Sequence, residues 1–235
     1  MRINRYLATC GLGSRRKCEQ LVKDGLVTVN GVSVDQLGIQ IGPDDRVMLN
    51  GILVEPINQK QYLILNKPGG FLTSLSDDRG RRTVMDLVTT EINVKPVGRL
   101  DFDTTGALLM TNDGELAFRL THPRFKISKV YLALLWKPLP PEDARRLESG
   151  VHLEDGLTAP CSARTWGDGR RIQVILREGR KRQVKRMFEV LGHRVRQLHR
   201  SEFAGITVKG LDEGEWRDLT DDEVLQLKKK TGLVK

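Results

Sequence analysis

The segment GRLDFDTTGALLMTNDGELA, residues 98–117, combines a turn, a strand and the start of a helix. Its glycine-flanked first part predicts a tight turn, and the apolar run Ala107–Met110 predicts a buried strand. Asn112-Asp-Gly114 then turns the chain into a helix that we expect over Glu115–Leu120. The segment therefore predicts mixed strands and helices, with a polar turn at one end of a buried strand.

Two carboxylates, Asp101 and Asp103, lie in this turn. A carboxylate that precedes a buried strand is well placed to project into a cleft. A plain turn aspartate fits the same pattern, and each carboxylate is a rival of the other for a catalytic role. Spacing alone leaves these alternatives open.

The rest of the chain also mixes strands and helices without regular alternation, which predicts an α+β fold with a largely antiparallel sheet. Thr220 is the expected cap of a last helix. Beyond residue 60 we expect five further strands, Tyr62–Asn66, Val130–Trp136, Ile172–Leu176, Val195–Leu198 and Phe203–Val208. We expect two further helices, Glu142–Ser149 and Lys181–Leu191.

The first 54 residues read as a small unit of their own. Helical spacing predicts helices over Arg2–Thr9 and Ser14–Asp24, and Asn30-Gly31 predicts a hairpin between two alternating strands. Residues 55–60 read as a linker. We therefore expect one domain over residues 1–58 and a second over 59–235.

Composition indicates a folded, soluble protein of 235 residues with 39% hydrophobic residues. There is neither an apolar run of about 20 residues nor a signal-peptide core, so we expect a cytosolic location. Its three cysteines, Cys10, Cys18 and Cys161, form no Cys-x-x-Cys pair, and its histidines show no metal-ligand spacing. These patterns argue against disulfides and a metal site.

The net charge of +9 is concentrated in two segments. Residues 164–200 contain twelve Arg and Lys against three acids, and residues 1–25 contain six against two. A merely soluble basic surface would fit the total charge. Two separate basic patches favour a surface that binds nucleic acid.

The N-terminal patch lies on predicted helices. Arg15, Arg16 and Lys17 fall in the first turn of a helix, where basic side chains oppose the helix dipole and free amides attract phosphate. A solvated polar face is the alternative. RINRYLA (residues 2–8) and SRRKCEQLVKDGLVTVNG (residues 14–31) resemble the RNA-binding domain named after ribosomal protein S-four.

The second domain also resembles a known family. It contains the motifs KPGG (67–70), residues 98–117, THP (121–123), KVY (129–131) and EGRKRQVKRMF (178–188). The order of these motifs is similar to that of the RsuA/RluB-type ribosomal RNA pseudouridine synthases, closest to the RluB branch that modifies large-subunit RNA. Relatives often carry an aromatic residue or asparagine where this chain has Lys181-Arg182.

The resemblance implies a catalytic domain around a bent, mostly antiparallel sheet, and a reaction that detaches uracil, rotates it and rejoins it through carbon 5. It implies Asp101 as the nucleophile or base, and Tyr131 as the residue that stacks on uracil and assists at carbon 5. Lys185 is expected to pair with Asp101 and to keep it ionised by lowering its pKa. Without the resemblance, Tyr131 reads as a sheet residue and Lys185 as a lysine on a polar helix face. No cofactor or metal is required.

Leu198 matches the apolar residue that lines the uracil pocket, although a core leucine is the simpler reading. Arg99 is expected to fill the stack vacated by a flipped-out uridine or to hold the neighbouring phosphate. The side chains expected to contact RNA are Arg2, Arg5, Arg15, Arg16, Lys17, Lys126, Lys129, Arg180, Lys181, Arg182 and Arg186.

The expected partner is structured ribosomal RNA or a ribosomal-subunit precursor, bound by a monomer. Two other functions fit the same sequence. One is a non-catalytic RNA-binding or ribosome-assembly factor that keeps the fold. The other is a synthase that acts on small-subunit ribosomal RNA or on transfer RNA.

Overall fold

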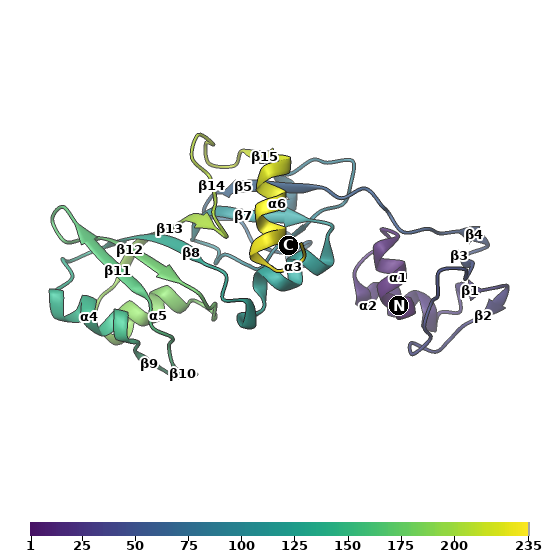
Figure 1. Ribbon diagram of the computed structural model, residues 1–235, viewed down its shortest axis with the longest axis horizontal. Helices are drawn as coiled ribbons and strands as arrows, with labels where there is room; N and C mark the ends of the chain where they lie inside the picture. The colour runs from purple at the N-terminus through teal and green to yellow at the C-terminus, as the bar shows by residue number, and fades with distance from the viewer. Residues whose placement is uncertain (235) are drawn as a thin grey trace. The chain divides into compact units, whose positions relative to one another are not determined.

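The computed structural model describes residues 1–234, which form two compact units, residues 1–60 and the residues from Gln61 onward (Figure 1). Each unit has its own hydrophobic core. No helix within the described range is long and apolar enough to cross a membrane.

The first unit packs two short helices against a small antiparallel sheet of order β2-β1-β3-β4. Ser14 caps the second helix, because its hydroxyl accepts a hydrogen bond from the Lys17 amide at 3.1 Å. The helices are α1 (Ile3–Thr9) and α2 (Arg15–Lys23), and the strands are β1 (Val27–Val29), β2 (Val32–Ser33), β3 (Val47–Leu49) and β4 (Ile52–Leu53).

The hairpin predicted at Asn30-Gly31 is confirmed. Both residues have a positive φ, 53° and 82°, and the turn joins β1 to β2. Asn50-Gly51 repeats this geometry between β3 and β4, with φ of 50° and 79°. Asparagine and glycine suit these turns because they tolerate the left-handed conformation.

The described part of the second unit contains a nine-stranded sheet whose main path is β11-β12-β8-β13-β7-β5-β15, with β14 added to β13 and β6 to β7. Among the described strands of this sheet, only β13 and β7 pair in parallel, so the predicted α+β fold with a mostly antiparallel sheet is confirmed. The strands are β5 (Tyr62–Lys67), β6 (Lys95–Pro96), β7 (Thr105–Thr111), β8 (Lys129–Leu135), β11 (Ser162–Trp166), β12 (Arg171–Leu176), β13 (Val195–Phe203), β14 (Ile206–Thr207) and β15 (Trp216–Asp218).

Helices cover different parts of this sheet (Figure 1). Helices α4 (Pro141–Ser149) and α5 (Gln183–Val190) pack against β8, β11, β12 and β13 around a shared apolar core. Helices α3 (Gly114–Thr121) and α6 (Asp221–Lys230) share another core with β5, β7 and β13. Two 3₁₀ turns, Val84–Asp86 and Pro123–Phe125, and a small hairpin of β9 (His152–Leu153) and β10 (Gly156–Leu157) complete the unit.

Two predicted boundaries were wrong. The strands expected over Val195–Leu198 and Phe203–Val208 are one long strand, β13, followed by a turn at Ala204-Gly205 and the short β14. The helix expected from Lys181 begins at Gln183, because Arg182 adopts a left-handed conformation with φ of 51°. Residues 180–182 therefore form a loop.

Candidate active site

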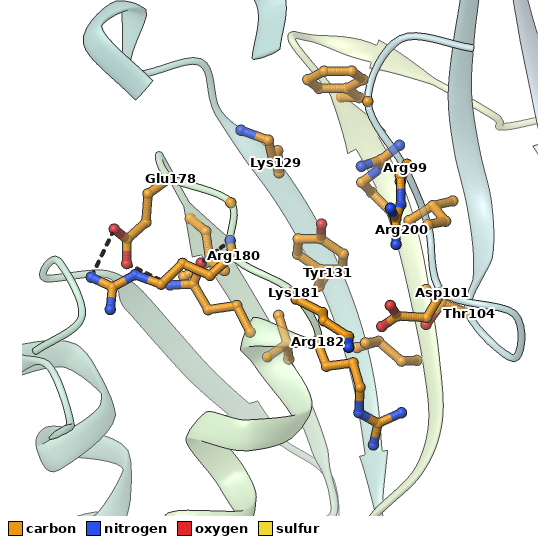
Figure 2. A pocket seen from close by; sticks show the side chains of 18 of the residues that line it. Arg99, Asp101, Thr104, Lys129, Tyr131, Glu178, Arg180, Lys181, Arg182 and Arg200 are labelled. Carbon is orange, nitrogen blue, oxygen red and sulfur yellow. Dashed lines mark hydrogen bonds and ion pairs between the residues drawn. The ribbon is translucent and has the colours of Figure 1, made fainter. Parts of the chain in front are cut away.

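A cavity of about 390 Å³ opens at the centre of the second unit. One wall is the loop before β7, which carries Asp101, and another is the loop of residues 178–182 before α5. Tyr131 of β8 and Leu198 of β13 form apolar lining between them. Figure 2 shows the Asp101 carboxylate pointing from its loop into this pocket.

A buried lysine holds the Asp101 loop in place. Lys67, at the end of β5, is fully buried, and its Nζ donates to the carbonyls of Asp101 at 3.2 Å and Thr104 at 3.0 Å. It also reaches the carbonyls of Pro68 at 3.0 Å and Phe102 at 3.4 Å. Burial lowers the pKa of Lys67 to about 8, although the nearby carboxylates oppose this shift. These bonds fix the main chain and leave the carboxylate of Asp101 to the pocket.

The same loop is closed by hydrogen bonds on both sides of Asp101. The Thr73 hydroxyl donates to the Leu100 carbonyl at 2.8 Å and accepts from the Leu100 amide at 3.2 Å. The Thr104 amide donates to the Asp101 carbonyl at 3.1 Å. The position of Asp101 is therefore set by the main chain rather than by contacts of its own side chain.

Lys185 pairs with Asp103, and the expected pairing with Asp101 was wrong. Lys185 Nζ donates to Asp103 Oδ1 at 2.5 Å. Asp101 and Asp103 are the first and third residues of one turn, which presents Asp101 to the pocket and Asp103 to α5. Burial raises the pKa of Asp103, but the hydrogen bond and charge of Lys185 outweigh this effect and bring the pKa below its usual value.

Arg200 lies beside Tyr131 at the base of the pocket, since the two residues are cross-strand partners. It is 2% exposed, its Nε donates to the Ala107 carbonyl at 2.7 Å, and its guanidinium lies 4.7 Å from the centre of the Phe203 ring. Its buried Nη2 has no hydrogen-bond partner within residues 1–234. A buried donor left unpaired is costly, so Nη2 is available to an acceptor on a ligand.

Lys129 adds a second cation to this wall of the pocket. Its Nζ donates to the Ile127 carbonyl at 3.0 Å and lies 5.6 Å from the centre of the Phe203 ring. Burial, helped by the charge of Arg200, lowers the pKa of Lys129 to about 8, and Glu178 opposes the shift. The amine therefore changes charge close to neutral pH.

The predicted RNA-contacting residues of the second unit divide into two groups. Arg99, Lys181 and Arg182 are exposed and line the pocket, and the Arg182 guanidinium pairs with Glu189 at 3.4 Å. Lys129 lines it too, but half-buried. Lys126 is exposed in a left-handed turn outside the pocket lining.

Arg180 and Arg186 instead tie the loop to the β9–β10 hairpin. Arg180 Nη2 donates to the Leu157 carbonyl at 2.6 Å and Nη1 to the Gly156 carbonyl at 3.0 Å. Arg186 makes two 3.0 Å bonds to the Asp155 carboxylate. Arg180 thus holds the loop and Arg186 holds α5 against this hairpin, with both terminal nitrogens of each guanidinium hydrogen-bonded.

The five basic residues predicted in the first unit are all exposed. Arg2 directly precedes α1 and Arg5 lies on it, and the first turn of α2 carries Arg15, Arg16 and Lys17.

Sequence reasoning gave no role to Lys67 or Arg200. A lysine at the end of the apolar strand Tyr62–Asn66 is a detectable signal, because burial of such a residue demands partners. Arg200 follows Leu198 at the strand period of two, which places both on one face. The missing partner of Arg200 depends on tertiary packing and has no local signature.

Comparison with known proteins identifies the family of each unit. The family RNA pseudouridylate synthase matches residues 61–190, and the S4 domain matches residues 1–47. The first range includes the Asp101 loop, Tyr131 and the 178–182 loop. These matches identify the chain as an RNA-modifying isomerase that carries an S4 domain.

Similar proteins span nearly the whole chain. Ribosomal large subunit pseudouridine synthase B of Bacillus subtilis is 42% identical and covers 97% of this chain and 95% of its own length. The dual-specificity RNA pseudouridine synthase RluF of Escherichia coli is 34% identical over 97% of this chain and 78% of its own. A pseudouridylate synthase crystal structure superposes with a TM-score of 0.72 at 31% identity, covering 97% of this chain and 99% of its own. The chain belongs to the RNA pseudouridine synthase family, in the RsuA/RluB group.

Proposed function

We propose that this enzyme isomerises a uridine of ribosomal RNA, and specifically of large-subunit RNA, to pseudouridine. The observation that carries the proposal is the Asp101 carboxylate, held by its main chain in a pocket with Tyr131 and several cations. The end-to-end similarity to a synthase named for the large ribosomal subunit supports the choice of RNA.

In the proposed reaction, Asp101 acts on the ribose of the bound uridine. Two routes are open to the carboxylate: it bonds to C1′ as uracil leaves, or it removes a ribose proton to give a glycal. In both routes the C1′–N1 bond breaks, uracil rotates, and a C1′–C5 bond forms. As it forms, the bond between Asp101 and C1′ breaks in the first route, and Asp101 returns the proton to the ribose in the second. The proton on C5 then leaves and N1 gains a proton, so that the ribose and the carboxylate are both restored.

The remaining lining residues hold the base and assist the last proton transfer. Tyr131 stacks on uracil, with Leu198 beside it, and the Tyr131 phenol assists removal of the C5 proton. Arg200 Nη2, which lacks a partner among the described residues, donates to an oxygen of the bound nucleotide.

The target uridine must leave its stack to reach Asp101. Arg99, two residues before Asp101, is exposed and lines the pocket. From there it can fill the vacated stack or hold the adjacent phosphate. We expect Arg99→Ala to lower kcat/KM on ribosomal RNA by roughly tenfold or more while the melting temperature stays unchanged. Steady-state kinetics and thermal melting of one protein sample test both parts, and wild-type activity would remove Arg99 from the mechanism.

The choice of RNA is tested by mapping pseudouridines in cells with and without this protein. We expect one or more large-subunit positions to revert to uridine in its absence, and the pseudouridines of small-subunit and transfer RNA to remain. If pseudouridine is lost only from small-subunit RNA or only from transfer RNA, that RNA is the substrate instead. An unchanged map in all three RNAs would favour the non-catalytic assembly factor.

A further inference from the structure

The strands of segment 164–200 carry arginines on both faces of the sheet. Arg200 lines the pocket, whereas Arg164, Arg171 and Arg196 do not. Side chains of facing residues in neighbouring antiparallel strands point to the same side. The row Ile172–Ala133–Leu198 therefore faces α4 and α5, whose side chains complete its core. The pocket residues Tyr131 and Arg200 pair on this same side.

The alternate rows face away from these helices. One row is Trp166–Arg171–Leu134–Gln197, and the other is Arg164–Gln173–Leu132–His199. All eight side chains are exposed or partly exposed, and none belongs to a core cluster of the described residues. We call these two rows, with Trp136 and Arg196 at their end, the open face.

Two tryptophans make this face unusual. Trp136 and Trp166 are 59% and 41% exposed, although burial of a large aromatic side chain is strongly favourable. The Arg196 guanidinium lies 5.1 Å from the centre of the Trp136 ring. Flat rings next to guanidinium groups are the combination on which unpaired nucleic-acid bases stack.

The charge on the open face is mainly positive, and Asp168 is the acid whose charge interacts with Arg171. Arg164, Arg171 and Arg196 form no ion pair within the part of the chain that the structure describes. Asp168, in the β11–β12 turn, is paired with Arg170 through a 2.6 Å bond. A polyanion with exposed rings complements this surface, whereas an apolar partner would have to desolvate the three arginines.

We propose that the open face binds unpaired bases of RNA, as a second RNA site on the side of the sheet opposite the pocket. We expect this RNA to be a segment of ribosomal RNA remote from the target uridine, and only this choice of RNA rests on the proposed function. A small stem-loop that fills the pocket does not reach the opposite face of the sheet. The open face therefore contributes to binding of a long RNA and not to turnover of a minimal substrate.

The test uses the full chain and a labelled single-stranded oligoadenylate, which contains no uridine to isomerise. The double variant Trp166→Ala/Arg171→Glu should bind this probe roughly tenfold or more weakly than wild type. Trp166→Phe, which keeps a ring, should stay close to wild type. Arg145→Glu makes the same charge change at an exposed arginine of α4 and should also have little effect.

If the double variant binds the oligoadenylate as tightly as wild type, the proposed RNA site is wrong. The same result is expected if the open face binds a protein partner. The proposed site is also wrong if Arg145→Glu loses as much affinity as the double variant. A loss in Trp166→Phe as large as in the double variant would overturn the stacking role.

The same variants are then assayed on a stem-loop containing the target uridine, where the double variant should turn over within about twofold of wild type. A large fall there would overturn the separation of the open face from the pocket. If wild type itself fails to isomerise the stem-loop, the proposed function fails, and the oligoadenylate result still decides the open face.

Discussion

Two carboxylates two residues apart have different surroundings in this enzyme. Asp103 is held by Lys185, and Asp101 lines the pocket on a loop fixed by Lys67. The ion pair with Lys185 stabilises the charge of Asp103 but also occupies its carboxylate. We therefore propose that Asp101, which lines the pocket with Tyr131, is the carboxylate that meets the substrate.

The charge of the pocket should depend on pH through Lys129, whose pKa is about 8. The amine is charged below that value and neutral above it, so affinity for RNA should fall as pH rises from about 7 to about 9. Lys129→Arg, which stays charged, should show a flatter profile. Binding titrations over this pH range measure the difference, and identical profiles would exclude Lys129 as the titrating group.

Among the elements, the parallel pairing of β7 with β13 brings the Asp101 loop close to the base of the pocket. Gly106 of β7 lies opposite Arg200 of β13 with a φ of 105°. A Cβ at this position would press on the Arg200 carbonyl oxygen and lie 2.8 Å from its backbone nitrogen. The close approach of the two strands therefore requires glycine.

Gly106→Ala should destabilise the enzyme by about 2–4 kcal/mol, because strain and overlap both act at a backbone contact. A fall in the melting temperature of roughly 5–10 °C is expected. Gly114→Ala is the matched control, since Gly114 begins α3 with open space around it and no positive φ. Equal melting temperatures for both variants would contradict the packing described for β7 and β13.

Local elements could be predicted from the sequence because their signals are local. The apolar runs at Ala107–Met110 and Val130–Trp136 and the turn at Asn30-Gly31 are examples. The partner of Lys185 could not be predicted, because both carboxylates of one turn fit the same spacing. Strand order and the orphaned nitrogen of Arg200 arise only when distant segments pack.

For the whole molecule, the first unit contributes exposed basic residues but no residue of the pocket. The first unit has its own core and presents Arg15, Arg16 and Lys17 to solvent, whereas all residues of the pocket belong to the second unit. Substrate binding and the chemical step should therefore respond separately to mutation.

Replacing Arg15, Arg16 and Lys17 together by alanine should raise KM for ribosomal RNA by roughly tenfold and leave kcat within about twofold. The variant should also lose part of the salt dependence of binding, since fewer counterions are released. Kinetics at several salt concentrations test this, and a fall in kcat with unchanged KM would contradict it.

The assignment of Asp101 is tested most directly by comparing Asp101→Asn with Asp103→Asn in single-turnover isomerisation of a ribosomal RNA fragment. Both substitutions remove one negative charge from the same turn and keep the side-chain size. We predict no detectable pseudouridine with Asp101→Asn, although RNA is still bound, and measurable pseudouridine with Asp103→Asn. Isomerisation by Asp101→Asn, or its loss only in Asp103→Asn, would contradict the account.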